Sequence, residues 1–180
     1  MRGQKGQGTG AMMTTALAGV IARDLRALRR ELEAYPDERD LWRLVPGIAN
    51  SGGTLALHLT GNFKHFVGAV LGATGYVRDR GAEFSRRDAP RSERLREIDE
   101  ALGVVDRTLA SLGDDTLARP FPQAVGGVTV TTGDFLLHLA THLTYHLGQV
   151  DYHRRMVTGR TEQVGAVAVG EPPSARRATA

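Results

Sequence analysis

Four stretches of this chain repeat apolar residues at three- and four-residue steps, and segments rich in Gly and Pro separate them. Such spacing gathers the apolar residues on one side of a helix. The stretches cover about residues 14–35, 51–73, 92–112 and 132–157. Helices of about 20 residues joined by long connections predict an all-α four-helix bundle, and the long second connection allows the chain to cross the bundle.

The two ends of the chain differ from the middle. Residues 1–13 lack the apolar run of a signal peptide, and residues 159–180 are rich in Gly, Ala, Pro and Arg. Segments of this composition bury too little apolar surface to offset the conformational entropy lost on folding. We therefore expect a disordered leader over 1–13, one folded domain over 14–158 and a disordered tail over 159–180.

The chain contains no cysteine. Disulfides, iron–sulfur clusters, thiolate zinc sites and a cysteine nucleophile are therefore excluded, and any metal site must use His, Asp, Glu or water. The absence of cysteine fits a reducing compartment, so we expect a cytoplasmic protein. The chain also lacks the apolar run of about 18 or more residues that a membrane-spanning helix requires.

The net charge of +3 comes from the ends of the chain. Lys and Arg total 23 and Asp and Glu total 20, but five of the positive and two of the negative residues lie in 1–13 or 159–180. The middle of the chain thus carries 18 charges of each sign. A protein that follows nucleic-acid phosphates needs a concentrated basic face. We therefore expect a small-molecule substrate and no nucleic-acid partner.

Histidines are concentrated on the second and fourth predicted helices. A helix turns about 100° per residue, so His138, His142 and His146, at four-residue steps, lie on one side of the fourth helix. His153 returns to that side seven residues later. Because apolar residues flank these positions, we expect the histidine face to point into the bundle, where each imidazole needs a polar partner.

Two histidines four residues apart can bind one metal ion, as in helical zinc motifs. His138 and His146 are about 12 Å apart along the helix axis, so a single ion takes one four-residue pair. A third ligand would then come from the second helix, which carries His58 and, seven residues later, His65. The alternative is that each histidine is a hydrogen-bonded core residue, the interpretation we adopt for His65 and His153.

Three segments resemble the DinB/YfiT-like family. FLLHLATHLTYHLGQ, residues 135–149, is similar to the family's last-helix signature, in which the second of two histidines four residues apart precedes a Gly-Gln pair. NSGGTLALHLTGN, residues 50–62, is similar to its second helix, and VRDRGAEF, residues 77–84, resembles a subgroup of the family. The resemblance covers about 14–158, and it assigns as metal ligands His58, His142 and His146.

The resemblance implies a crossed four-helix bundle that often forms homodimers and binds zinc or nickel through three histidines. Family members of known activity are thiol-dependent transferases and isomerases, and some are hydrolases. This chain has Leu147 where Arg is common in the family. A substrate contact made by that Arg is therefore in doubt here.

Three neutral imidazoles leave a tetrahedral ion with one open position and its full positive charge. Our first hypothesis is that the ion binds and deprotonates a low-molecular-weight thiol, which then attacks an electrophilic small molecule. Because the chain has no cysteine, the thiol would be a cofactor such as glutathione, mycothiol or bacillithiol. The alternatives are a metal-dependent hydrolase and a non-catalytic bundle with a structural metal site.

Four polar residues near the predicted ligands have two interpretations each. Asn62 and Gln149 lie within about one turn of a ligand, where each can hydrogen-bond a ligand's second ring nitrogen or serve interhelical packing. His138 can line the pocket or contact a ligand. Tyr145 can donate a hydrogen bond to a substrate or pack as an aromatic side chain.

A charged cluster lies in the connection between the second and third predicted helices, at Arg78, Arg80 and Glu83. It can contact an anionic substrate or the carboxylate of a thiol cofactor. It can also form solvated ion pairs at the surface, which contribute little to stability. We favour the second interpretation.

Overall fold

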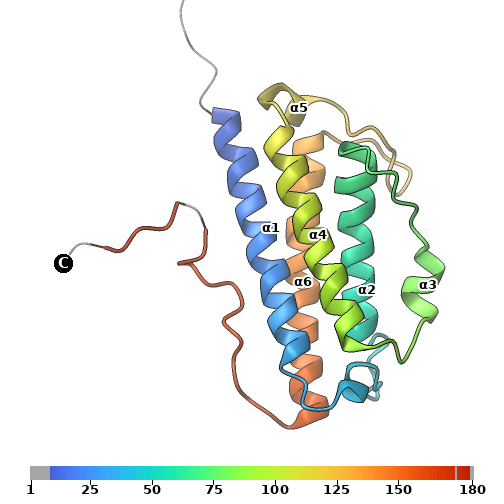
Figure 1. The fold of residues 1–180 in the computed structure, drawn as a ribbon. Coiled ribbons are helices and arrows are strands. Elements are labelled where there is room, and N and C mark those ends of the chain that lie inside the picture. Colours follow the sequence, from blue (N-terminus) through green and yellow to red (C-terminus); the bar gives the residue numbers. More distant parts are fainter. Residues whose placement is uncertain (1–8, 173, 179–180) are drawn as a thin grey trace, which may run out of the picture.

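The computed structural model describes residues 9–172 and 174–178 (Figure 1). This part of the chain holds six α-helices: α1 (Thr9–Glu33), α2 (Gly52–Asn62), α3 (Arg80–Ser85), α4 (Arg91–Ser111), α5 (Asp114–Ala118) and α6 (Thr132–Thr158). A 3₁₀ helix, η1 (Glu38–Leu41), follows α1, and a π-helix, η2 (Phe63–Leu71), continues α2. None of these helices combines the length and apolar composition that a membrane crossing requires.

Four long rods form the bundle. Helix α1 packs against α4 and α6, and α2 with η2 packs against the same two helices, so α1 and α2 lie on opposite sides of the bundle. Figure 1 shows α2 and α4 running in one direction and α1 and α6 in the other. The connection that carries α3 therefore travels the length of the bundle. The predicted four-helix bundle with crossover connections is confirmed.

The apolar stripes of the helices meet in one core. Ile21 and Leu25 of α1, Val105 of α4 and Leu143 of α6 are fully buried, and each belongs to the periodic pattern of its helix. Burying such side chains stabilises the fold by roughly 1.5–3 kcal/mol each. The other faces of the long helices, which carry the predicted site residues, lie at the edge of this core.

Local signals set the ends of the helices. The Ser51 hydroxyl accepts a hydrogen bond from the Thr54 N–H and caps α2, and the Thr131 hydroxyl accepts one from Asp134 N–H and caps α6. Helix α6 ends at Gly159, whose φ of 68° is left-handed. Helices α4 and α6 begin and end within one residue of the prediction, because the apolar period of each stops at segments that contain Gly and Pro.

The second predicted helix is present, but it is not one regular α-helix. It was expected as one helix over 51–73, but it becomes the π-helix η2 at Phe63. A π-helix closes i→i+5 hydrogen bonds and turns less per residue than an α-helix. His65 lies in this π-helix, outside the histidine cluster, and its Nε2 contacts the Gln123 side chain instead.

The segment before α6 folds back in a narrow turn. Val125 and Val128 exchange two backbone hydrogen bonds, and the two glycines between them have φ of 60° and 82°, which suits a tight hairpin turn. This turn and the pairing of Pro120 with Thr131 are isolated β-bridges. Residues 9–172 and 174–178 contain no longer β-strand.

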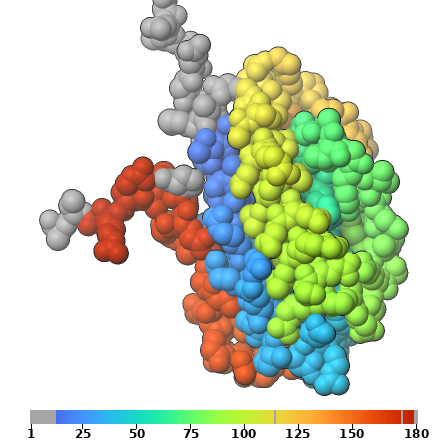
Figure 2. Space-filling view, viewed as in Figure 1, coloured from blue at the N-terminus to red at the C-terminus, as the bar shows by residue number. Residues whose placement is uncertain are grey.

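The domain limits of 14 and 158 stay predictions, and the structure describes contacts near both ends of the chain. Helix α1 already begins at Thr9, and residues 1–8 of the predicted leader lie outside the described residues. Part of the predicted tail lies along α1 (Figure 2). The Arg30 guanidinium donates to the Val164 carbonyl at 2.7 Å and to the Glu171 carboxylate at 3.1 Å. Hydrogen bonds thus connect this segment to the bundle.

A buried ion pair between α1 and α6 gives a stability prediction. Arg154 and Glu31 are both about 1% exposed and 2.5 Å apart. Replacing Arg154 by Ala leaves a buried carboxylate without its partner, so the free energy of unfolding should decrease by about 3–5 kcal/mol. Urea unfolding measures this loss. The control is Arg155→Ala, which removes a more exposed pair with Asp151 and should change stability by less than about 1 kcal/mol. Equal losses would contradict the prediction.

Candidate metal centre

Three histidines meet where α2 packs against α6. His58 comes from α2, and His142 and His146 come from successive turns of α6. The ring centroids are 5.2 Å apart for His58 and His142, 5.5 Å for His58 and His146, and 4.4 Å for His142 and His146. The structure therefore brings together the three residues that the resemblance selects.

The Nε2 atoms of these rings face one another. His142 Nε2 is 3.4 Å from His58 Nε2 and 3.1 Å from His146 Nε2. One ring nitrogen from each histidine lies within 4.8 Å of the other two. Two nitrogens bound to a tetrahedral ion at about 2.0–2.1 Å are roughly 3.3 Å apart. The two distances from His142 Nε2 are close to this value, and the cluster could hold a divalent ion.

Polar side chains face the other nitrogen of each ring. His58 Nδ1 donates to the Glu83 carboxylate at 3.1 Å, and His146 Nδ1 donates to Gln149 Oε1 at 2.5 Å. These acceptors keep the proton on Nδ1 of both rings, so that their Nε2 atoms carry the lone pairs that can bind a cation.

Asn62 lies between two of the rings. Its buried side-chain nitrogen is 3.3 Å from His58 Nε2 and 3.5 Å from His142 Nδ1. Rotation of the Asn62 side-chain amide by half a turn would exchange its nitrogen and oxygen. The oxygen could then accept a hydrogen bond from His142 Nδ1. This second orientation is the one that ligation through both Nε2 atoms requires.

Glu83 is a site residue that the sequence interpretation missed. It is buried, and Arg78 donates to it twice, at 2.6 and 2.7 Å, while Glu83 itself contacts His58. Gly61 makes this contact possible, because a Cβ there would overlap the Glu83 carboxylate. The favoured interpretation of Arg78 and Glu83 as a solvated pair is wrong, since both side chains are largely buried. Arg80 is exposed, with its guanidinium 5.6 Å from the Phe84 ring centre.

Burial and neighbouring charges set the protonation of the cluster. Burial, together with the nearby His146 and His58, lowers the pKa of His142 to about 4. Burial also lowers the pKa of His146, although the hydrogen bond to Gln149 opposes the shift. For Glu83, burial favours the neutral acid, but hydrogen bonds from Arg78 and His58 outweigh it and lower its pKa. Neutral imidazoles beside an ionised carboxylate are the state that metal binding needs.

Two of the predicted pocket residues lie on the rim. His138 is exposed and stacks on the His142 ring at 5.9 Å, and Tyr145 is exposed with its ring 5.1 Å from that of His146. The expectation that the whole histidine face points inward is wrong at His138. Four-residue steps drift by about 40°, which places His138 at the edge of that face.

His65 and His153 lie apart from the cluster. His153 is buried, accepts a hydrogen bond from the Tyr35 hydroxyl at 2.7 Å and donates to the Arg43 carbonyl at 2.8 Å. It is the hydrogen-bonded core histidine that was predicted. His65 pairs with Gln123, as described above.

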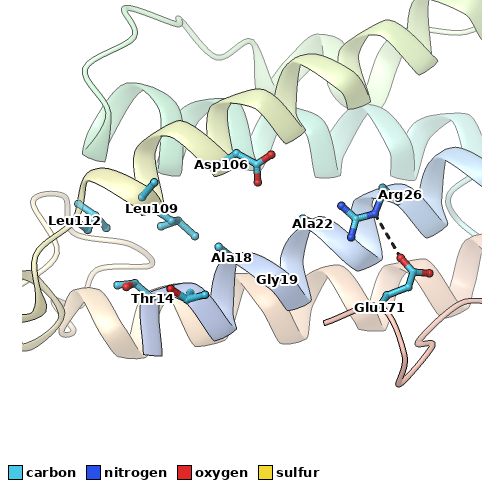
Figure 3. Close-up of a pocket in the computed structure, with 11 residues that line it drawn as sticks. Thr14, Ala18, Gly19, Ala22, Arg26, Asp106, Leu109, Leu112 and Glu171 are labelled. Atoms are coloured by element: carbon cyan, nitrogen blue, oxygen red, sulfur yellow. Dashed lines mark hydrogen bonds and ion pairs between the residues drawn. The ribbon is translucent and has the colours of Figure 1, made fainter. Parts of the chain in front are cut away.

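A separate cavity of about 380 Å³ lies between α1 and α4 (Figure 3). Ala18 and Asp106 line it, and Arg26 at its edge is paired with Glu171 of the C-terminal segment. No histidine lines this cavity among the described residues. The cavity therefore does not belong to the histidine cluster.

Comparison with known protein families assigns the chain to a family. The sequence matches the family described as the DinB superfamily over residues 21–150, which is more than half of its length. The chain belongs to the DinB superfamily. The matched range includes the three clustered histidines, Glu83 and Gln149. Comparisons with curated proteins and with solved structures find no match.

The neutral state of His142 predicts how the stability of this DinB protein depends on pH. Its pKa is about 4 in the folded protein and 6.5 in an ordinary environment. Between these values the unfolded chain binds more protons, so the contribution to stability is complete above about pH 6.5 and decreases as the pH falls toward 4.

Urea unfolding of metal-free protein at several pH values between 7.5 and 5.0, with about half-unit steps, measures this decrease. A His142→Asn variant should lose less stability over the same range, because it has no imidazole to protonate on unfolding. The same decrease in wild type and variant would show that His142 does not contribute.

Proposed function

We propose that this DinB-superfamily member binds one divalent metal ion, zinc or nickel, through His58, His142 and His146. The observation that supports this is the convergence of three Nε2 atoms while the other ring nitrogens face polar side chains. If all three rings carry their proton on Nδ1, and the Asn62 amide takes the orientation that presents its oxygen to His142 Nδ1, three lone pairs face one another without a donor. A cation satisfies them together, whereas ordinary core hydrogen bonding does not.

The ligand set favours a reactive ion over a structural one. Structural zinc sites are closed by four protein ligands, whereas catalytic sites keep a position open. In the described part of the chain, the cluster offers three histidines. When bound there, a divalent ion would lower the pKa of a thiol or water at the open position. We propose that the protein transfers a low-molecular-weight thiol to an electrophilic small molecule, with metal-dependent hydrolysis as the alternative.

The chain's own residues would orient the ligands and border the substrate. Glu83 and Gln149 hold the rings of His58 and His146, and Asn62 contacts both His58 and His142. Tyr145 is at the rim, where its hydroxyl can reach a substrate. The homodimer inferred from the resemblance and the cytoplasmic location inferred from the absence of cysteine stay predictions.

Metal analysis of purified protein loaded with zinc or nickel tests the centre. Wild type should retain about one ion per chain, and His58→Ala should lose most of it, because only two ligands remain. His138→Ala is the matched control and should retain the ion, since His138 is outside the cluster. Loss in both variants, or in neither, would contradict the proposed ligand set.

Activity measurements separate the thiol, hydrolytic and structural functions. Conjugation of glutathione, mycothiol or bacillithiol to an electrophile should occur with metal-loaded wild type and decrease at least about 100-fold in His142→Ala. Hydrolysis of esters or amides without thiol would support the alternative. If neither reaction occurs and chelation strongly lowers the melting temperature, the ion is structural.

The contact of Glu83 with His58 gives a second prediction for metal affinity. Glu83→Gln keeps the size of the side chain and removes its charge, so the affinity should decrease about 10–100-fold. Gly61→Ala should have a similar effect, because its Cβ displaces the Glu83 carboxylate. Gly148→Ala is the control, since a Cβ there meets no atom within 4 Å. Isothermal titration with zinc measures the affinities, and unchanged binding in Glu83→Gln would refute the role of that carboxylate.

A further inference from the structure

A second cavity, of about 430 Å³, lies beside the histidine cluster. Helices α2 and α6 form two of its walls, and the connection before α2 forms the third. The residues used below are Ile48 and Asn50 from the connection, Leu55 from α2, and Gln149, Tyr152 and Met156 from α6. Its volume is in the range of about 300–1,000 Å³ that is typical of small-molecule sites.

The cavity begins about one helical turn from the histidines. Leu55 precedes His58 by three residues, and Gln149 follows His146 by three residues. Because α2 and α6 run in opposite directions (Figure 1), both steps lead toward the same end of the bundle. At the usual rise each step is about 4.5 Å long. Gln149 belongs to both places, since it lines the cavity and its Oε1 accepts a hydrogen bond from His146 Nδ1.

The walls of the cavity are mainly apolar. Ile48, Tyr152 and Met156 are large side chains that remain 36%, 68% and 48% exposed, although they lie close together. A cluster of exposed apolar side chains commonly marks a binding surface. No described residue that lines this cavity is charged. The side chains of Asn50, Gln149 and Tyr152 provide a few polar groups, as ligand sites usually do.

The surroundings of His58 Nδ1, unlike the cavity, are charged. Arg78 and Glu83 form their buried pair there, and the Glu83 carboxylate contacts His58. An uncharged, apolar compound is therefore better accommodated on the Gln149 side. A charged group in the cavity would lose hydration without gaining an ion-pair partner.

We propose that this cavity binds the uncharged aromatic or branched aliphatic part of the substrate, with the reactive group of that compound directed toward the histidine cluster. The cavity thereby selects apolar electrophiles over anionic ones. The position of the reactive group rests on the proposed metal function, but binding of the apolar part does not. The two can therefore be tested separately.

Binding to metal-free protein tests the cavity alone. In protein labelled with ¹³C at the methionine methyl groups, titration with benzyl alcohol should shift the Met156 signal and leave that of Met13, on α1, unchanged. Benzoate, a similar ring with a negative charge, should bind at least about tenfold more weakly. A Met156 signal that does not shift on addition of benzyl alcohol would overturn the proposal. So would a shift produced by protein concentration alone, which would mark a contact between copies of the chain.

A matched pair of variants checks the location. Ile48→Glu places a charge in the cavity and should weaken benzyl alcohol binding at least about tenfold. Leu137→Glu is the control, because Leu137 is also an exposed apolar residue, 55% accessible, and lies about 18 Å along α6 from Gln149. Equal effects in the two variants would contradict the location.

Thiol binding to nickel- or cobalt-loaded protein separates the cavity from the metal function. Thiolate-to-metal absorption should show 2-phenylethanethiol binding about tenfold or more tightly than 2-mercaptoethanol, because its ring buries apolar surface. Ile48→Glu should remove this difference. If neither thiol binds but benzyl alcohol still shifts Met156, the cavity proposal stands and the proposed function fails. If both thiols bind equally in wild type, the cavity proposal fails and metal binding of thiols stands.

Discussion

The packing of α2 against α6 is the contact on which the candidate site depends. Neither helix alone holds enough ligands, because α6 offers the pair His142 and His146 and α2 offers His58. The apolar core fixes how these two helices meet, since Leu143 and its neighbours are buried on the adjacent face of α6. Burial of the core thus places three polar rings at its edge, where His142 Nε2 lies 3.4 Å from His58 Nε2 and 3.1 Å from His146 Nε2.

Local sequence patterns were sufficient for much of this arrangement. Apolar period and end signals agree for α4 and α6, so their limits could be predicted to one residue. The four-residue spacing of His142 and His146 is a property of a single helix, and it predicts a shared face from geometry alone. The choice of His58 over His65 needed the resemblance. Periodicity placed both on one face, whereas the structure pairs His65 with Gln123 in the π-helix that begins at Phe63.

The remaining site residues depend on the path of the chain. Glu83 is distant in sequence from His58, and its contact exists only because the crossover returns along α2 and Gly61 leaves room for the carboxylate. No helical or strand period encodes such a contact, and a run of charged residues ordinarily indicates a solvated surface. The prediction that His138 points into the bundle failed for a different reason. A four-residue repeat drifts around the helix, but it was treated as a single face.

The two long connections give the histidine cluster two unlike sides. The crossover after α2 supplies Arg78 and Glu83, a buried ion pair that keeps a negative charge against His58. The connection before α2 supplies Ile48 and the apolar cavity that continues from Gln149. Rigid helices thus hold the rings, while connections decide what surrounds them, a division that lets loop changes alter specificity without moving the ligands. A compound approaching the cluster would therefore meet apolar surface on one side and fixed charge on the other, so its orientation follows from its own polarity.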